Sequence, residues 1–126
     1  MPATKPQSWD AVLAEHDPAV AEAARAVQRL VVASLPAAVE TFDPGDGLLA
    51  IGTSRSMRDF LFALIPHRAY VNLQLADGVD LPNPDGLIEG TGKRIRHVKV
   101  RSAEAAGSAA VRAIVEAQVR MRGKAE

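Results

Sequence analysis

The sequence predicts an α+β fold, in which an antiparallel sheet of about five strands is covered on one face by N- and C-terminal helices. Three observations lead to this prediction. Apolar residues recur at helical spacing near both ends of the chain, between 20 and 35 and between 111 and 119. Short apolar segments separated by turn residues fill the middle. One of them, Tyr70–Leu75, alternates between polar and apolar side chains, which is typical of a strand with one buried face.

The N-terminal part contains recognisable helix starts. Ser8 is expected to cap a short helix that runs to about His16. Asp17 followed by Pro18 predicts a longer helix, because an aspartate can accept from the first free N–H groups and proline at the first helical position loses no hydrogen bond. Pro36 is expected to end this helix.

The middle of the chain predicts strands joined by tight turns. Asp43–Gly47 is rich in turn residues and is expected to connect two short strands. Phe60–Ile65 is a continuous apolar run, and we expect it to pair with Tyr70–Leu75 in a hairpin that has His67 at its tip. A continuous apolar run of this length predicts a buried strand, so the aromatic rings of Phe60 and Phe62 are assigned to the core.

The last third is expected to be a loop, a strand and a helix. Residues 77–93 are predicted to be loop, with one helical turn near Asp85–Glu89. Ile95–Val100 is the last predicted strand, with His97, Lys99 and Arg101 on the face opposite to the core. Ser102 is expected to cap a single C-terminal helix.

Composition limits the classes of protein that fit. The 126 residues suffice for one domain with its own core, which we expect at 18–122, after an N-terminal arm or short helix at 1–17 and before a tail at 123–126. Fifteen cations balance fifteen carboxylates, and there is no cysteine for disulfides, thiolate catalysis or cysteine-based metal sites. With no apolar run of about 18 residues and no signal-like start, we expect a cytoplasmic protein without membrane partners.

Motifs for catalysis are incomplete. Gly-Thr-Gly-Lys resembles the end of a phosphate-binding loop, but Leu87 stands where that motif needs glycine and Arg94 follows Lys93 where it needs serine or threonine. No nucleophile elbow or serine–histidine–aspartate arrangement is readable. The sequence therefore predicts a protein that is not an enzyme and has no cofactor.

Metal binding and nucleic-acid binding receive limited support. His67 and His97 could approach each other in the fold and form a site with Asp85 or Glu89, but the histidines have no short ligand spacing. Aromatic residues make up only 4% of the chain, and none interleaves with the basic residues that follow Gly92. Nucleic acid is therefore not the expected partner.

Charge is unevenly distributed around one glycine-rich loop. Residues 77–89 carry carboxylates without a cation, and a basic cluster follows at Lys93, Arg94, Arg96, Lys99 and Arg101. These blocks are expected either to form weak surface pairs or to line the two sides of a site.

The segment from His67 to Ser102, HRAYVNLQLADGVDLPNPDGLIEGTGKRIRHVKVRS, resembles the YdhG-like bacterial domain of unknown function. The likeness covers about 18–122 and includes Pro-His, Val-Asn-Leu, Leu-Pro-x-Pro, Gly-Thr-Gly-Lys and Arg-His-hydrophobic-Lys in this order. It implies an α+β fold with helices flanking an antiparallel sheet, but no particular activity. Some relatives are described as frataxin-like iron chaperones, which use an acidic ridge, whereas the charged cluster of this chain is basic.

The leading hypothesis from the sequence is a small non-catalytic binding module for an anionic ligand or a partner protein. The site is expected where the hairpin tip, the glycine-rich loop and the last strand meet, and its predicted residues are His67, Asn72, Glu89, Gly90, Thr91, Gly92, Lys93, Arg94, Arg96 and His97. Two alternatives stay open. One is a homodimer or larger homo-oligomer that uses the basic strand as an edge, with Glu89 paired to Lys93 or Arg94. The other is frataxin-like delivery of iron or another metal.

Overall fold

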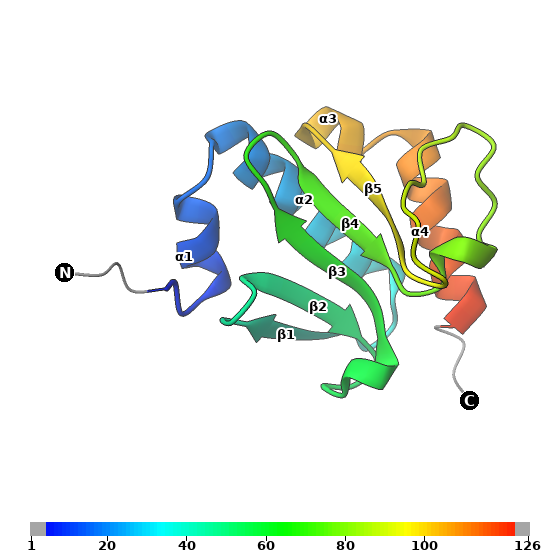
Figure 1. Cartoon of the computed structure of the whole chain (residues 1–126), viewed down its shortest axis with the longest axis horizontal. Coiled ribbons are helices and arrows are strands. Elements are labelled where there is room, and N and C mark those ends of the chain that lie inside the picture. The colour runs from blue at the N-terminus through cyan, green and yellow to red at the C-terminus, as the bar shows by residue number, and fades with distance from the viewer. Residues whose placement is uncertain (1–4, 123–126) are drawn as a thin grey trace.

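A five-stranded antiparallel sheet forms one layer of the computed structural model, which describes residues 5–122 (Figure 1). The strands lie side by side in the order in which they occur in the chain. They are β1 (Val39–Asp43), β2 (Leu48–Gly52), β3 (Phe60–Pro66), β4 (Val71–Leu75) and β5 (Arg96–Val100). Short 3₁₀ turns at Met57–Asp59 and Gly78–Asp80 lie between strands.

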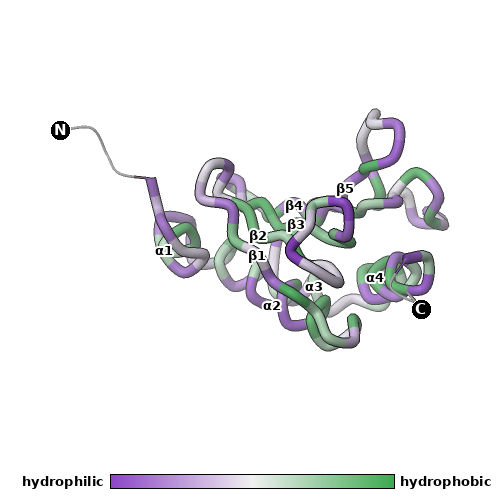
Figure 2. The backbone as a smooth tube through the Cα atoms, turned by 90° about the horizontal axis from the view of Figure 1, so that it is seen from below, coloured by the Kyte–Doolittle hydropathy of each residue, from purple (hydrophilic) through white to green (hydrophobic). Residues whose placement is uncertain are grey.

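The helices are α1 (Trp9–Ala14), α2 (Pro18–Ser34), α3 (Ala103–Ala106) and α4 (Ala109–Arg122). Figure 2 shows α2, α3 and α4 on the same side of the sheet. In Figure 1, α1 lies beyond the end of the strands, beside the β1–β2 and β3–β4 turns. The predicted fold, a sheet of five antiparallel strands with helices on one face, is confirmed.

The helix starts follow from their capping residues. The Ser8 hydroxyl accepts a hydrogen bond from the N–H of Ala11 at 3.1 Å. The Asp17 carboxylate accepts from the N–H of Ala19 at 2.9 Å, and Pro18 occupies the first helical position. Both predicted helix starts are therefore confirmed.

The β3–β4 hairpin positions the residues at its tip. Its register runs from Phe62 opposite Leu75 to Pro66 opposite Val71. The N–H of His67 donates to the carbonyl of Tyr70 at 2.7 Å and closes the turn. The predicted hairpin, with His67 at its tip, is confirmed.

The hydrophobic core fills the space between the sheet and the helices. Leu64 and Leu73 of the sheet and Val27 and Val115 of the helices are fully buried. Trp9 attaches α1 to this body, because its side chain is 7% exposed and its indole N–H donates to Gln28 Oε1 at 2.9 Å. The short N-terminal helix is thus part of the packed core.

The C-terminal helix differs from the prediction, since it is two helices rather than one. Ser102 caps only α3, which ends at Gly107. The hydroxyl of Ser108 then accepts from the N–H of Val111 at 3.2 Å at the start of α4. Glycine weakens a helix and serine offers a new cap, so the Gly-Ser pair restarts the chain in a new helix.

The loop after β4 also differs from the prediction, because its helical turn is at Gly78–Asp80 and not at Asp85–Glu89. The reason is a side chain. Asn83 accepts from the N–H of Ile88 and donates to its carbonyl, both at 3.0 Å, and so holds the intervening residues in a turn.

The expected tail at 123–126 and the first four residues of the expected arm lie outside the described residues. Within residues 5–122, no helix has the length and apolar character that crossing a bilayer requires.

Candidate functional site

The sheet has a second face, opposite to the helices, and we call it the open face. Strand registers place one residue of each strand in a row across it: Thr41, Ala50, Ala63, Gln74 and His97. The centre of this row consists of small side chains. Polar and basic side chains lie on β4 and β5, at the end of the face next to the β3–β4 turn.

Tyr70 is the centre of a basic group on this face. Lys99 Nζ lies 5.2 Å and Arg101 Cζ lies 5.4 Å from the centroid of the Tyr70 ring. The His67 ring lies 5.0 Å from it, between centroids. A cation near an aromatic face is attracted by the ring, so Tyr70 holds two cations and an imidazole together. We call the following residues the open-face cluster: His67, Tyr70, Asn72, His97, Lys99 and Arg101.

The surroundings of His67 disfavour its charged form. Asn72 Nδ2 lies 3.1 Å from His67 Nε2, so that in this amide orientation the ring nitrogen accepts and carries no proton. Burial lowers the pKa of His67 below 6.5, and the positive charges of His16, His97 and Lys99 lower it further. Both effects disfavour the imidazolium.

Asn72 has a second polar atom that the protein leaves unpaired. Its Oδ1 is buried and has no hydrogen-bond partner among the described residues. Asn72 lies between Ile65 and Lys99 in the sheet register. A buried amide oxygen without a donor is costly, and the opposite amide orientation, in which Oδ1 accepts from a protonated His67 Nε2, would satisfy it within the protein.

Glu89 joins the cluster through the backbone and through its side chain. Its N–H and carbonyl pair with the carbonyl and N–H of His97 at 2.8 and 2.9 Å, which extends the sheet beyond β5. Its Oε1 lies 3.6 Å from Lys99 Nζ and 3.9 Å from His97 Nε2. The predicted pairing of Glu89 with Lys93 or Arg94 is therefore wrong, because the bridge directs Glu89 to β5.

The glycine-rich loop lies between the Glu89 bridge and β5, and its first glycine is next to the cluster, since a Cβ at Gly90 would lie 3.5 Å from His97 Nδ1. Gly90 has a φ of 122°, a value that glycine adopts readily. The carbonyl of Gly92 accepts from Arg96 Nε at 2.7 Å, so this guanidinium closes the loop. Thr91 and Lys93 are exposed. Of the predicted residues, the structure brings together His67, Asn72, Glu89, Gly90 and His97.

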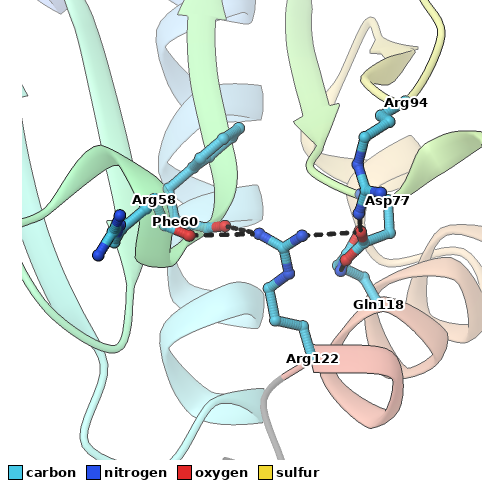
Figure 3. A network of polar contacts seen from close by, with 6 residues as sticks. All are labelled: Arg58, Phe60, Asp77, Arg94, Gln118 and Arg122. Atoms are coloured by element: carbon cyan, nitrogen blue, oxygen red, sulfur yellow. Dashed lines mark hydrogen bonds and ion pairs between the residues drawn. The ribbon is translucent and has the colours of Figure 1, made fainter.

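Arg94 belongs to a separate network around the buried side chains of Asp77 and Gln118, shown in Figure 3. Asp77 is 3% exposed, and its Oδ1 accepts from Arg94 Nη2 at 2.5 Å and from Arg122 Nη2 at 2.9 Å. Gln118 donates to Asp77 Oδ2 and accepts from the Asp77 N–H, both at 2.8 Å. Arg122 also donates to the carbonyl of Phe60 at 3.4 Å. The network satisfies a buried carboxylate and fastens the loop after β4 to α4.

Sequence reasoning missed some of these residues, although signals for them exist. Tyr70, Lys99 and Arg101 alternate onto the same sheet face as Asn72 and His97, but their convergence depends on the pairing of β4 with β5. Gln118 lies at helical spacing from Val111, Ile114 and Val115 on the apolar stripe of α4. A polar residue on such a stripe indicates a buried hydrogen-bonded side chain.

The metal hypothesis requires His67, His97 and a carboxylate to converge, but only His97 lies beside one, Glu89. Within residues 5–122, no group of three or more histidine, aspartate or glutamate side chains could hold a metal ion. His67 instead contacts Asn72, and His16 Nδ1 lies 2.8 Å from the carbonyl of Val12 in its own helix.

Comparison of the chain with family models, curated proteins and solved structures found no match. The resemblance to the YdhG-like domain therefore stays a prediction. Function is inferred below from the chemistry of the described residues.

Proposed function

We propose that the protein is a non-catalytic binding module for a small ligand with a phosphate or carboxylate group, and that it binds this ligand at the open-face cluster. The supporting observation is the gathering of Lys99 and Arg101 around one Tyr70 ring, beside His67. Cations held this close repel each other, and a bound anion relieves that repulsion while accepting charge-assisted hydrogen bonds.

The two cations set the chemistry of the ligand. Lys99 lies opposite Asn72 in the register of β4 and β5, and Arg101 follows two positions later on the same face. A ligand that binds both cations must present at least two negative oxygens. A phosphate and a carboxylate each have these oxygens, whereas a halide ion has none.

Glu89 reduces the positive charge that the cluster presents to an anion. Its carboxylate lies 3.6 Å from Lys99 Nζ, where it partly neutralises this cation. An incoming anion competes with Glu89 for Lys99. Replacing Glu89 with glutamine should therefore strengthen anion binding, which gives a gain of function as a test.

His67 provides a pH-linked readout of binding. Burial and, to a smaller extent, the nearby positive charges hold the pKa of His67 below 6.5, and an anion in the cluster offsets these charges. Bound anion should therefore raise the pKa of His67. By linkage, protonation of His67 should strengthen binding of the anion by the same factor, so affinity should increase as the pH falls through the pKa of His67.

The test is a titration with inorganic phosphate, followed by NMR of the backbone amides and the histidine rings. Lys99→Gln and Arg101→Gln should each weaken binding by at least about tenfold, because each loses one charge-assisted hydrogen bond. Lys93→Gln is the matched control, since it removes an exposed cation from the glycine-rich loop.

Two outcomes would contradict the proposal. If Lys93→Gln weakens phosphate binding and Lys99→Gln does not, the anion binds at the loop and not at the cluster. If neither phosphate nor a carboxylate such as citrate shifts the resonances of β4 and β5, the cluster is not a ligand site.

A further inference from the structure

A pocket separate from the open-face cluster lies between residues 82–87 and α4. Its volume is about 160 Å³. One wall is the loop, with Pro82, Pro84 and Leu87, and the other is the helix, with Ala113 and Ala117. The proposed anion site contributes no residue to this pocket, so its chemistry is an independent question.

The loop wall is constrained by hydrogen bonds and by prolines. Asn83 is hydrogen-bonded twice to Ile88, and Ile88 is 8% exposed and part of the core. Pro82 and Pro84 restrict the backbone on both sides of Asn83. Gly86 has a φ of 69°, which allows the chain to turn back toward Leu87. A wall held in this way has little freedom to collapse onto the helix.

The helix wall is open because its side chains are short. Ala113 and Ala117 are one turn apart on α4, and both line the pocket, with Ile114 beside them. A longer side chain at either alanine would project into the space between helix and loop. These alanines therefore leave room for an apolar group of the ligand.

The volume sets the size of that group. A cavity of about 150 Å³ in another protein accommodates one benzene molecule. The pocket of about 160 Å³ therefore accepts a single six-membered ring or a branched aliphatic group of similar size.

Charge at the rim sets the polar part of the ligand. Arg120 lines the pocket one turn beyond Ala117, is exposed, and forms no ion pair within residues 5–122. Asp85 lines the loop side of the same pocket. Arg120 attracts one carboxylate, and Asp85 disfavours a second negative charge. A ring with a single carboxylate complements both the volume and the rim.

We propose that this pocket binds a small monocarboxylate with an apolar ring, with the ring between Ala113 and Leu87 and the carboxylate at Arg120. The test uses benzoate as the probe, with benzyl alcohol as an uncharged analogue and benzylamine as a cationic one. Binding is followed by NMR of alanine methyl groups, because Ala113 and Ala117 report directly on the ring.

Benzoate should shift the methyl resonances of Ala113 and Ala117 and should bind more tightly than benzyl alcohol. Arg120→Gln should weaken benzoate about tenfold, while the affinity for benzyl alcohol should change less than twofold. Arg112→Gln, an exposed arginine of the same helix that does not line the pocket, is the matched control and should leave both affinities unchanged. Ala113→Leu should abolish binding of both ligands, and far-UV circular dichroism checks that it folds.

Other results would overturn the proposal. If benzylamine binds more tightly than benzoate, Asp85 rather than Arg120 selects the ligand, and the ligand is a cation. Equal losses in Arg112→Gln and Arg120→Gln would show a general charge effect. Alanine shifts that disappear in Lys99→Gln, or that phosphate reverses, would place benzoate at the open-face cluster. No shift at any alanine methyl would mean that the pocket takes no such ligand.

Discussion

Replacing Gln118 with leucine isolates the contribution of the buried amide in α4. Gln118 is fully buried and forms two hydrogen bonds with Asp77, one to its N–H and one to its carboxylate, both 2.8 Å long. Leucine has a similar volume, so the change removes the polar contacts without leaving a large cavity. The N–H and one carboxylate oxygen of Asp77 then lose their partners inside the protein.

The expected loss of stability follows from these two groups. A buried donor or acceptor left without a partner costs about 1–3 kcal/mol, so losing partners for two such groups should destabilise the variant by about 2–6 kcal/mol. For a domain of this size, about 4 °C accompanies each kcal/mol, which predicts a fall in Tm of about 8–24 °C. The ion pairs of Asp77 with Arg94 and Arg122 should persist, because both use Asp77 Oδ1, to which Gln118 is not bonded.

Urea and thermal unfolding, followed by far-UV circular dichroism, measure this loss. Glu116→Leu is the matched control, because it introduces the same side chain at an exposed position of α4 and should change stability by less than about 0.5 kcal/mol. A Gln118→Leu protein as stable as the control would refute the reasoning, and would mean that Asp77 is satisfied without the amide. Hydrogen exchange at the Asp77 amide should accelerate in the variant if the reasoning holds.

Further changes test other parts of the structure. Thr41→Val should stabilise the protein by about 1 kcal/mol in urea unfolding, because it removes a buried hydroxyl that has no hydrogen-bond partner in the structure. Trp9→Phe should cost about 1 kcal/mol through loss of the bond to Gln28, and a larger loss would indicate that α1 detaches. Because the pKa of His67 is below 6.5 in the folded state, the unfolded chain takes up its proton first, and stability should fall as the pH decreases from 6.5 to the folded pKa. A series of urea midpoints across this range should flatten in His67→Gln.

Most of the architecture could be predicted because local signals agree with the global fold. Asp17-Pro18, the turn at Asp43–Gly47 and the alternation in Tyr70–Leu75 each depend on a few adjacent residues, and the structure follows each of them. The break at Gly107-Ser108 was missed because the apolar stripe continues through α3 and α4, although the backbone restarts between them. Periodicity describes which face is buried and does not show where a helix is interrupted.

The candidate site was predictable only in part, since it depends on contacts between strands. His67 and Asn72 were expected near the hairpin tip, and they meet there. The cations that surround Tyr70 come from β5, and their distance from the ring depends on a register that composition does not reveal. Arg94 looked like a ligand-binding residue by its sequence neighbours, but it pairs with Asp77, which lies 17 positions earlier.

The order of the strands has a consequence for how the chain reaches its native state. Because each strand pairs with its neighbour in the sequence, β1 to β4 can assemble by short connections, and only the pairing of β5 with β4 closes a long loop, residues 76–95. The tight turn at His67 and Tyr70 makes the β3–β4 hairpin a suitable nucleus. The bonds from α4 to Asp77 span 41 and 45 positions, so closing these loops in the unfolded chain costs conformational entropy. We therefore expect these bonds to form after the sheet, which brings their ends together. We therefore expect fast folding with high φ-values in β3 and β4 and low φ-values in the last turns of α4.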